Sequence, residues 1–297
     1  MENAGSGKPQ NLTFSIKIAD VVLTAVSPNA AIHLTLNTPY IPFQSTEHHS
    51  DISFHYQCSP LPSCQEGRLI FDSQGSYRIY RHQEKYLIPL GKGETTRLAA
   101  FDRGFTHGEV YNAPPKAGER QEPVTIYLFE HPLDQLALVN YLAPGRGVLM
   151  HASALVAEGR GWLFPGVSGA GKSTMINLWQ GAGVNLLGDD RIIIRRRNGS
   201  FRIYGTPWHG EARIASPDSG TLDKIFFLEK APQNFIRPLA PMEAVTRLVV
   251  CSFPPLYDKD GMGAILDFFS QLVTQTPCYE LGFVPEAGVR DFIREVA

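Results

Sequence analysis

The glycine-rich residues 166–174 constrain the fold of this chain more than any other part of its sequence. They have the spacing Gly-x-x-x-x-Gly-Lys-Ser, in which glycines let successive backbone N–H groups turn inward around the oxygens of a polyphosphate. Lys172 adds a positive charge, and Ser173 adds a hydroxyl that can bind Mg2+. We therefore predict a loop that binds the phosphates of ATP. Its members are Gly166, Val167, Ser168, Gly169, Ala170, Gly171, Lys172, Ser173 and Thr174.

The residues around this loop have the pattern of the strand and the helix that such a loop requires. Residues 161–165 form a short apolar run that predicts a buried strand ending at the loop. Residues 173–180 place their large apolar side chains on one helical face, and the glycines after them end the helix. The alternative interpretation is a flexible glycine turn. A similar run at residues 5–8 has no preceding strand and is followed by Pro9, so we predict a loose N-terminal tail there.

The composition is that of a globular chain. Its 297 residues are enough for two domains, with 43% hydrophobic and 19% charged residues. A net charge of −2 gives no electrostatic reason to expect nucleic-acid or membrane-surface binding. No apolar run reaches membrane-spanning length and the N-terminus lacks a signal-peptide pattern, so we expect a cytoplasmic protein. The four cysteines lack zinc or disulfide spacing and are expected to be free thiols: Cys58, Cys64, Cys251 and Cys278.

The two halves of the chain differ in their hydrophobic pattern. Before residue 130 apolar residues alternate with polar ones in short runs, which predicts an antiparallel β-rich domain over residues 1–130. Residues 132–142 switch to helical spacing, and this helix could pack on either neighbour. We predict an α/β domain over residues 131–297 that carries the loop. We also expect an exposed loop at residues 114–123, and a polar loop rather than a metal site at His48 and His49.

A pair of acids follows the loop after one predicted helix and one apolar strand. Two adjacent carboxylates at this place, Asp189 and Asp190, indicate one ligand for Mg2+ and one acceptor for the proton of an attacking hydroxyl. The alternatives are a polar turn between two strands, or a charge pair with Arg191 or Arg195. Residues 147–165 have the pattern of a hairpin, which would place a histidine of its first strand, His151, beside the strand that enters the loop.

The order of His151, the glycine loop and the Asp-Asp pair resembles the C-terminal catalytic domain of the HPr kinase/phosphorylase family, over about residues 145–230. The resemblance implies an α/β fold shared with phosphoenolpyruvate carboxykinase. It implies that Asp189 is the general base for a serine hydroxyl and that Asp190 and Ser173 hold Mg2+. It also implies that His151 stabilises charge near the base. Members of the family form hexamers, which leaves a homo-oligomer open.

One segment departs from the pattern of that family. HPr kinases carry Glu-x-Arg-Gly-x-Gly beyond the acid pair, whereas residues 205–213 read Gly-Thr-Pro-Trp-His-Gly-Glu-Ala-Arg. We predict a loop facing the substrate, in which Arg213 neutralises charge on the transferred phosphoryl group. The alternative is a proline turn with a packed Trp208. The chain is thus expected to be an ATP- and Mg2+-dependent kinase that acts on a serine of a protein or ribosomally made peptide. The alternatives are a small-molecule kinase of the free-serine type and a non-catalytic ATP-binding scaffold.

Overall fold

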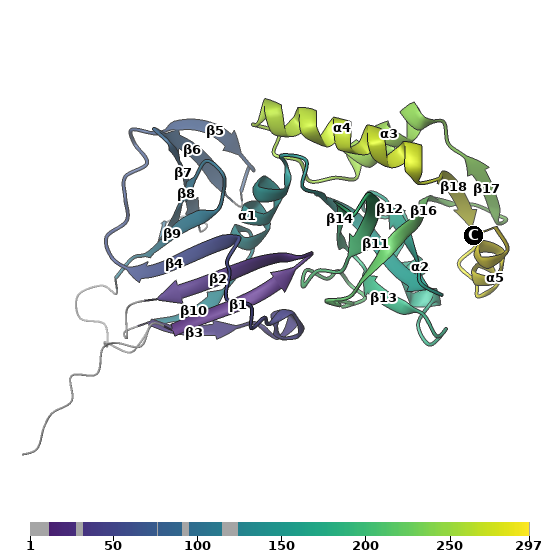
Figure 1. Cartoon of the computed structure of the whole chain (residues 1–297), viewed down its shortest axis with the longest axis horizontal. Coiled ribbons are helices and arrows are strands. Elements are labelled where there is room, and N and C mark those ends of the chain that lie inside the picture. The colour runs from purple at the N-terminus through teal and green to yellow at the C-terminus, as the bar shows by residue number, and fades with distance from the viewer. Residues whose placement is uncertain (1–11, 28–31, 76, 91–94, 115–123, 297) are drawn as a thin grey trace, which may run out of the picture. The chain divides into compact units, whose positions relative to one another are not determined.

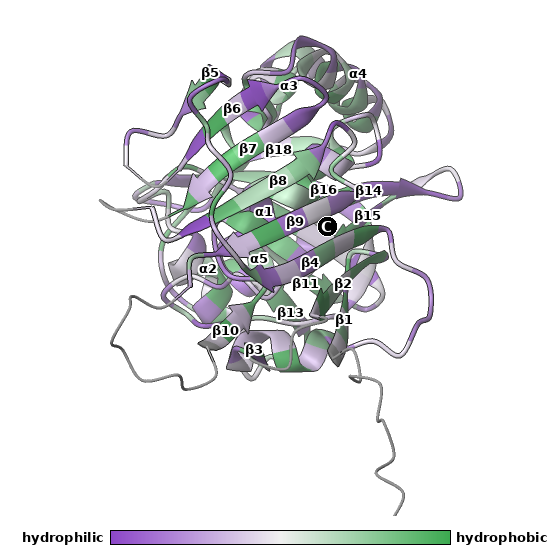
Figure 2. Ribbon diagram, turned by 90° about the vertical axis from the view of Figure 1, so that its left-hand side faces the viewer, coloured by the Kyte–Doolittle hydropathy of each residue, from purple (hydrophilic) through white to green (hydrophobic). Residues whose placement is uncertain are grey.

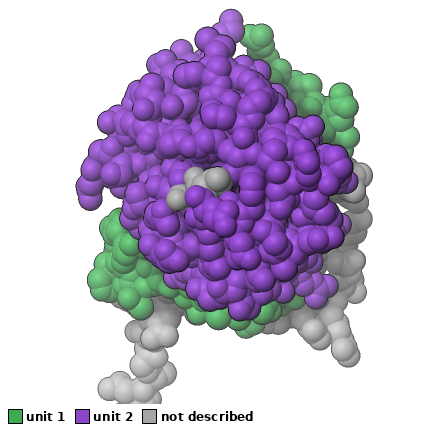
Figure 3. Space-filling view, turned by 90° about the vertical axis from the view of Figure 1, so that its right-hand side faces the viewer, with its two compact units in different colours: residues 1–17, 21–141 green, residues 18–20, 142–297 purple. Residues whose placement is uncertain are grey.

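The computed structural model describes residues 12–27, 32–75, 77–90, 95–114 and 124–296. The chain divides into two compact units (Figure 3). Unit 1 comprises Met1–Lys17 and Val21–Tyr141, and unit 2 comprises Ile18–Asp20 and Leu142–Ala297. The sequence predicted the boundary between residues 130 and 131, which put the helix of residues 132–142 in the second domain, although this helix could pack on either neighbour. In the structure that helix, α1 (Leu133–Leu142), falls in unit 1 except for its last residue.

Unit 1 consists mainly of strands (Figure 1). Among the described residues it contains an eight-stranded sheet in the order β1-β2-β4-β9-β8-β7-β6-β5 and the pair β10-β3. A short 3-10 helix, Thr38–Phe43, follows β3. The strands are β1 (Leu12–Ile18), β2 (Val21–Ser27), β3 (Ile32–Leu36), β4 (Ile52–Cys58), β5 (Arg68–Asp72), β6 (Arg78–His82), β7 (Lys85–Leu90), β8 (Arg97–Asp102), β9 (His107–Asn112) and β10 (Val124–Leu128).

The predicted antiparallel arrangement of the first half is wrong in part. Strand β4 pairs with both β2 and β9 in the parallel sense, and β3 with β10 likewise. Parallel neighbours need long connections, and here β3 and the 3-10 helix lie between β2 and β4. Strand β2 was not predicted, because most of its residues are buried and its sequence has no alternation to detect. The strands β8 and β9 were also not predicted.

Unit 2 is a mixed sheet with helices on both faces (Figure 1). The sheet order is β12-β11-β14-β15-β16-β18-β17, β13 pairs with β11, and β16 also pairs with β12. The strands are β11 (Val148–Ala157), β12 (Arg160–Pro165), β13 (Asn185–Gly188), β14 (Arg191–Arg197), β15 (Ser200–Tyr204), β16 (Ser219–Lys230), β17 (Phe235–Pro238) and β18 (Cys278–Phe283). The helices are α2 (Lys172–Leu178), α3 (Pro241–Val250), α4 (Lys259–Gln275) and α5 (Gly288–Val296).

The helices of unit 2 bury two separate apolar layers against the sheet. Helices α3 and α4 cover one layer, and α2 and α5 cover the other. In the second layer Trp162 of β12 and Trp179 at the end of α2 meet edge to face, with ring centroids 5.5 Å apart. Both rings are buried, and burial of such a side chain stabilises a fold by roughly 1.5–3 kcal/mol. This contact fixes the strand before the glycine loop to the helix after it.

The four cysteines are free thiols, as predicted. Residues 48 and 49 lie in an irregular polar segment, also as predicted. The predicted tail at residues 5–8 and most of the loop at residues 114–123 lie outside the described residues. Within the described part of the chain, every helix is too short or too polar to cross a lipid bilayer.

Candidate active site

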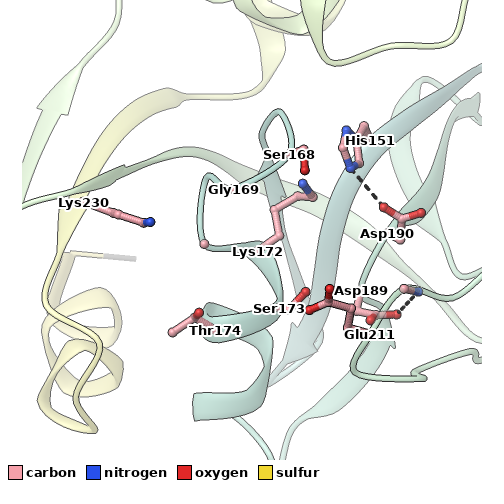
Figure 4. A pocket seen from close by; sticks show the side chains of 12 residues that line it. His151, Ser168, Gly169, Lys172, Ser173, Thr174, Asp189, Asp190, Glu211 and Lys230 are labelled. Carbon is pink, nitrogen blue, oxygen red and sulfur yellow. Dashed lines mark hydrogen bonds and ion pairs between the residues drawn. The ribbon is translucent and has the colours of Figure 1, made fainter.

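A cavity of about 490 Å3 lies beside the glycine loop of unit 2 (Figure 4). Its volume falls within the range of about 300–1,000 Å3 that is common for ligand sites. The lining residues come from β11, the glycine loop, the first turn of α2, the turn before β14, the loop at residues 210–211 and the end of β16. The lining residues are His151, Ser168, Gly169, Gly171, Lys172, Ser173, Thr174, Asp189, Asp190, Gly210, Glu211 and Lys230.

The glycine loop connects β12 directly to α2, in the order predicted from the sequence. Gly169 and Gly171 have φ values of 82° and 99°, a left-handed region that side chains with a Cβ rarely adopt. At Gly171 a Cβ would also lie 2.9 Å from Cζ of Phe283. The backbone N–H of Gly166 donates to the carbonyl of His151 at 3.1 Å and so fastens the loop to β11. The loop conformation therefore requires glycine at position 171.

Lys172 lies inside the loop that precedes it. Its side chain is only 6% exposed, and Nζ donates to the carbonyl oxygens of Gly166 at 2.9 Å and Val167 at 3.0 Å. Burial lowers the pKa of Lys172, and the negative charge of Asp190 partly opposes that shift. A cation removed from bulk water in this way attracts an anion more strongly than an exposed lysine does.

Asp189 is anchored by the backbone of a loop that is distant in sequence. It lies in the turn between β13 and β14 and is 1% exposed. Oδ1 accepts from the N–H of Gly210 at 2.9 Å and more weakly from that of Ile214 at 3.4 Å, and Oδ2 accepts from that of Ala212 at 2.7 Å. A carboxylate has about four acceptor positions, so one position on Oδ2 is left for a further partner.

Asp190 has side-chain partners instead. Nε2 of His151 lies 3.0 Å from Oδ1 of Asp190, and the guanidinium of Arg191 pairs with the same carboxylate. Burial alone would raise the pKa of Asp190, but the hydrogen bond from His151 and the charge of Arg191 outweigh it and hold the pKa below its usual value. The guanidinium of Arg191 lies 4.2 Å from the ring centroid of Phe253, which fixes its position. The charge pair between Asp190 and Arg191, which the sequence offered as an alternative to a functional role, thus exists, and Asp190 also lines the cavity.

The structure brings most of the predicted site residues together, but not all of them. His151, Asp189, Asp190 and the loop members Ser168, Gly169, Gly171, Lys172, Ser173 and Thr174 line the cavity. Gly166, Val167 and Ala170 are loop members outside its lining, and Val167 is 52% exposed. Arg213 is exposed and does not line the cavity either, so its role stays a prediction. Trp208 is buried, which agrees with the alternative of a packed side chain.

Three lining residues were not singled out as site residues: Gly210 and Glu211, which belong to the segment predicted to face the substrate, and Lys230, which was not predicted at all. Lys230 is the last residue of β16, which runs parallel to β12. The carboxyl ends of parallel strands lie at the same edge of a sheet, so the end of β16 lies at the edge that carries the glycine loop. The sequence does not show that β12 and β16 are parallel neighbours, and without this pairing Lys230 cannot be placed beside the glycine loop.

The comparisons with known proteins leave the family of the chain open. No protein-family model matches the sequence, and no curated protein matches it. Among solved structures, the chain is similar to the HPr(Ser) kinase/phosphatase from Coxiella burnetii, with a TM-score of 0.29 and 13% sequence identity. The match covers 50% of this chain and 99% of that chain. A likeness at this level does not establish membership of a family.

Proposed function

We propose that the chain is an ATP-dependent phosphotransferase that moves the γ-phosphoryl group to a hydroxyl. The observation that carries the proposal is the composition of one cavity, which combines a glycine loop, a desolvated lysine and two carboxylates with different partners. Phosphoryl transfer needs donors and positive charge around the phosphates, an acid to hold a divalent cation, and a proton acceptor near the attacking oxygen. The lining residues include a candidate for each of these tasks.

The polyphosphate would be bound by the glycine loop. In this proposal the backbone N–H groups of Ser168, Gly169 and Gly171 face the phosphate oxygens, because left-handed glycines turn nearby amides toward one centre. Lys172 contributes its positive charge from inside the loop, and Lys230 adds a second one from the end of β16. These two ammonium groups are the cations in the cavity lining, and they would offset the charge of the triphosphate.

The residues present fit Mg2+. The hydroxyl of Ser173 and the carboxylate of Asp189 both line the cavity, and oxygen ligands of this kind are the ones that Mg2+ prefers. Backbone N–H groups already fix the orientation of Asp189 and leave one acceptor position, as a metal ligand requires. Bound Mg2+ would supply neutralisation of charge on the phosphate oxygens. The sequence had given the metal to Asp190, whereas the contacts favour Asp189.

Asp190 is then the group that accepts the proton. As the acceptor oxygen bonds to the γ-phosphorus, the bond from that phosphorus to the β,γ-bridging oxygen breaks and ADP leaves. The hydroxyl proton passes to the carboxylate of Asp190, which His151 and Arg191 keep ionised and oriented. In this assignment Asp190 and Asp189 exchange the roles that the resemblance implied. We propose a serine of a protein or ribosomally made peptide as the acceptor. This choice rests on the order of His151, the glycine loop and the acid pair along the chain, which resembles that of the HPr kinase/phosphorylase family.

The test uses the full chain with γ-labelled ATP, Mg2+ and a panel of serine peptides, free serine and buffer alone. We expect labelled peptide, and we expect both Asp190→Asn and Asp189→Asn to reduce its formation. High Mg2+ or Mn2+ should restore part of the activity of Asp189→Asn, because a weakened metal site can be refilled by mass action, but none of the activity of Asp190→Asn. Asp267→Asn on the exposed face of α4 is the matched control.

The outcomes separate the alternatives. Labelled free serine with unlabelled peptides would replace the proposed acceptor by a small molecule. ATP binding without transfer to any acceptor, unchanged by Asp190→Asn, would contradict the kinase proposal and favour a scaffold that binds ATP. If high Mg2+ restores the activity of Asp190→Asn and not that of Asp189→Asn, then Asp190 is the metal ligand and Asp189 the proton acceptor, as first predicted.

A further inference from the structure

Three side chains with metal-binding atoms converge on the sheet of unit 1. They are His55 of β4 and His107 and Glu109 of β9, and one ligand atom from each lies within 4.8 Å of those of the other two. None of these residues belongs to the candidate active site. Strands β2, β4, β9 and β8 lie side by side in this part of the sheet (Figure 2).

The strand register explains why the three side chains meet. Strands β4 and β9 are parallel, with His55 opposite Glu109 and Ser53 opposite His107. Paired residues of adjacent strands point to the same face, and residues two apart on a strand do so as well. Their neighbours Phe54 and Val110 point to the other face and are fully buried. A regular, well-packed pair of strands therefore holds the three ligands, which limits how far they can move apart.

The contacts within this group bring two imidazole rings and one carboxylate close together. Nε2 of His107 lies 3.0 Å from Oε1 of Glu109, and the rings of His55 and His107 meet with centroids 4.6 Å apart. Within the described part of the chain, His55 has no hydrogen-bond partner for either ring nitrogen. One imidazole is thus paired with the carboxylate, and the second lies against it with its nitrogens uncommitted.

Two further residues orient the group. Oγ of Ser53 lies 2.9 Å from Nδ1 of His107, and the amide of Gln57 donates to Oε2 of Glu109 at 3.0 Å. A serine hydroxyl can donate or accept, so it can hold His107 in the tautomer whose Nε2 carries a lone pair. Histidines and carboxylates that bind metals commonly have such outer partners, which fix their orientation.

We propose that His55, His107 and Glu109 form a site for a divalent transition-metal ion, with Zn2+ as the ion that it fits. Two imidazole nitrogens and one carboxylate oxygen are a donor set that Zn2+ binds, with a fourth position left for water or another ligand. Hard cations such as Mg2+ prefer oxygen ligands throughout, so the two imidazoles select against them. The site differs in this respect from the all-oxygen set proposed for unit 2.

The ion would connect strands β4 and β9 of unit 1 through their side chains. The pairing of β4 with β9 joins β1, β2 and β4 on one side of the sheet to β9, β8, β7, β6 and β5 on the other. His55 and His107 are far apart along the chain, and a bond that closes a long loop removes more conformational freedom from the unfolded chain than one that closes a short loop. Zinc should therefore raise the unfolding temperature of the protein, since it binds the folded sheet and not the open chain.

Equilibrium dialysis of the full chain against micromolar Zn2+ tests the proposal. His151 and the acids of unit 2 can also bind zinc. The quantity to compare is therefore the difference in bound zinc between the unmodified chain and each variant. We expect His55→Ala/His107→Ala to lose one equivalent, and Ser53→Ala to bind that equivalent about 10-fold more weakly. His49→Ala is the matched control, because His49 also lies near two acids, Glu47 and Asp51, without a second histidine.

A second measurement uses the unmodified chain and therefore does not require a variant to fold. Zinc added to the unmodified chain should shift the imidazole NMR signals of His55 and His107 together at one equivalent, and leave that of His49 in place. Loss of the same zinc equivalent in His49→Ala, no loss in the double variant, or unshifted signals of His55 and His107 would each overturn the proposal. Failure of phosphoryl transfer by unit 2 would not affect this result, since the two sets of residues are separate.

Discussion

Each unit of the protein contains a histidine paired with a carboxylate at the same distance, and the two pairs have different surroundings. In unit 2, Nε2 of His151 lies 3.0 Å from Asp190 in the wall of a cavity. In unit 1, Nε2 of His107 lies 3.0 Å from Glu109 on regular strands. The pair alone therefore does not decide the chemistry. Lysines and backbone N–H groups surround the first pair and suit an anion, whereas a second imidazole accompanies the other and suits a cation.

The difference follows from where the residues lie in each sheet. The pair in unit 2 lies beside the glycine loop and the start of α2, where the first N–H groups of the helix have no carbonyl partner within the helix and can face a ligand. The pair in unit 1 lies within strands whose backbone groups are already bonded to their neighbours. There only side chains can bind a ligand. Variants of unit 2 test one side of this comparison, and the zinc measurements on His55 and His107 test the other.

The largest effect is expected for Asp190→Asn. An amide keeps the shape of the carboxylate but cannot accept the proton of the attacking hydroxyl, so kcat should fall about 10^2- to 10^4-fold while ATP affinity changes little. Steady-state rates of peptide labelling and a nucleotide-binding titration check this. Asp267→Asn should behave like the unmodified chain. Full activity of Asp190→Asn would contradict a catalytic role for the pair in unit 2, which would then have a structural role alone.

Lys172→Ala should come next in size. It removes the buried ammonium of the loop, and a lost charge-assisted hydrogen bond corresponds to about 10- to 100-fold weaker ATP binding. Isothermal titration calorimetry with ATP and Mg2+ measures the change. Lys259→Ala, on the exposed first turn of α4, is the control. Equal affinity of both variants would show that the cavity of unit 2 is not the anion site.

Gly171→Ala tests the backbone rather than a side chain. The residue has φ 99° and its added Cβ would contact Phe283, so we expect a loss of about 1–3 kcal/mol in the free energy of unfolding and weaker ATP binding. Gly263→Ala in the second turn of α4 has open space and should instead stabilise the protein by about 0.5–1 kcal/mol. Urea unfolding of both variants gives the two values. The same sign for both would contradict the strain assigned to the loop.

The smallest effect is expected for the ion pairs of Glu280, which lie outside the lining of the cavity beside the glycine loop. Arg237 and Arg247 both donate to Glu280 of β18, and the hydrogen bond from Arg237 is the main reason that the pKa of this carboxyl is lowered below 4.5. A lowered folded-state pKa stabilises the protein above the unfolded-state value, and this contribution is lost as the pH falls through the folded-state value. Glu280→Gln should destabilise the protein by about 1 kcal/mol at neutral pH and by less near about pH 3.

Urea unfolding of Glu280→Gln and the unmodified chain at both pH values measures this difference. The variant should label peptides at a rate near that of the unmodified chain. Glu280 pairs with Arg237 and Arg247, and none of the three residues lines the cavity. A destabilisation that grows toward low pH would show that the sign of the pKa shift is wrong. A large loss of transfer would mean that charge clusters outside the cavity also take part in the chemistry.

The sequence predicted those parts of the candidate site that depend on neighbours along the chain. The strand, the loop and the helix around residues 161–180 follow from a local pattern of apolar residues and glycines, and the structure has them in that order. The hairpin that places His151 beside the entering strand is also local. The antiparallel prediction for the first half was less successful, because alternation along a strand does not specify the direction of its partner.

By itself, the sequence predicted the strand, the glycine loop, the helix and the acid pair that follows them, because these features depend on residues that are close together along the chain. The tertiary structure alone decided that Asp189 is bound by the backbone of residues 210–214, that Lys230 joins the cavity and that Arg213 stays outside its lining. It also decided that His55 meets His107 and Glu109 through the register of two parallel strands. The physical reason is that pairing between distant strands depends on the packing of the whole sheet, which no local pattern contains.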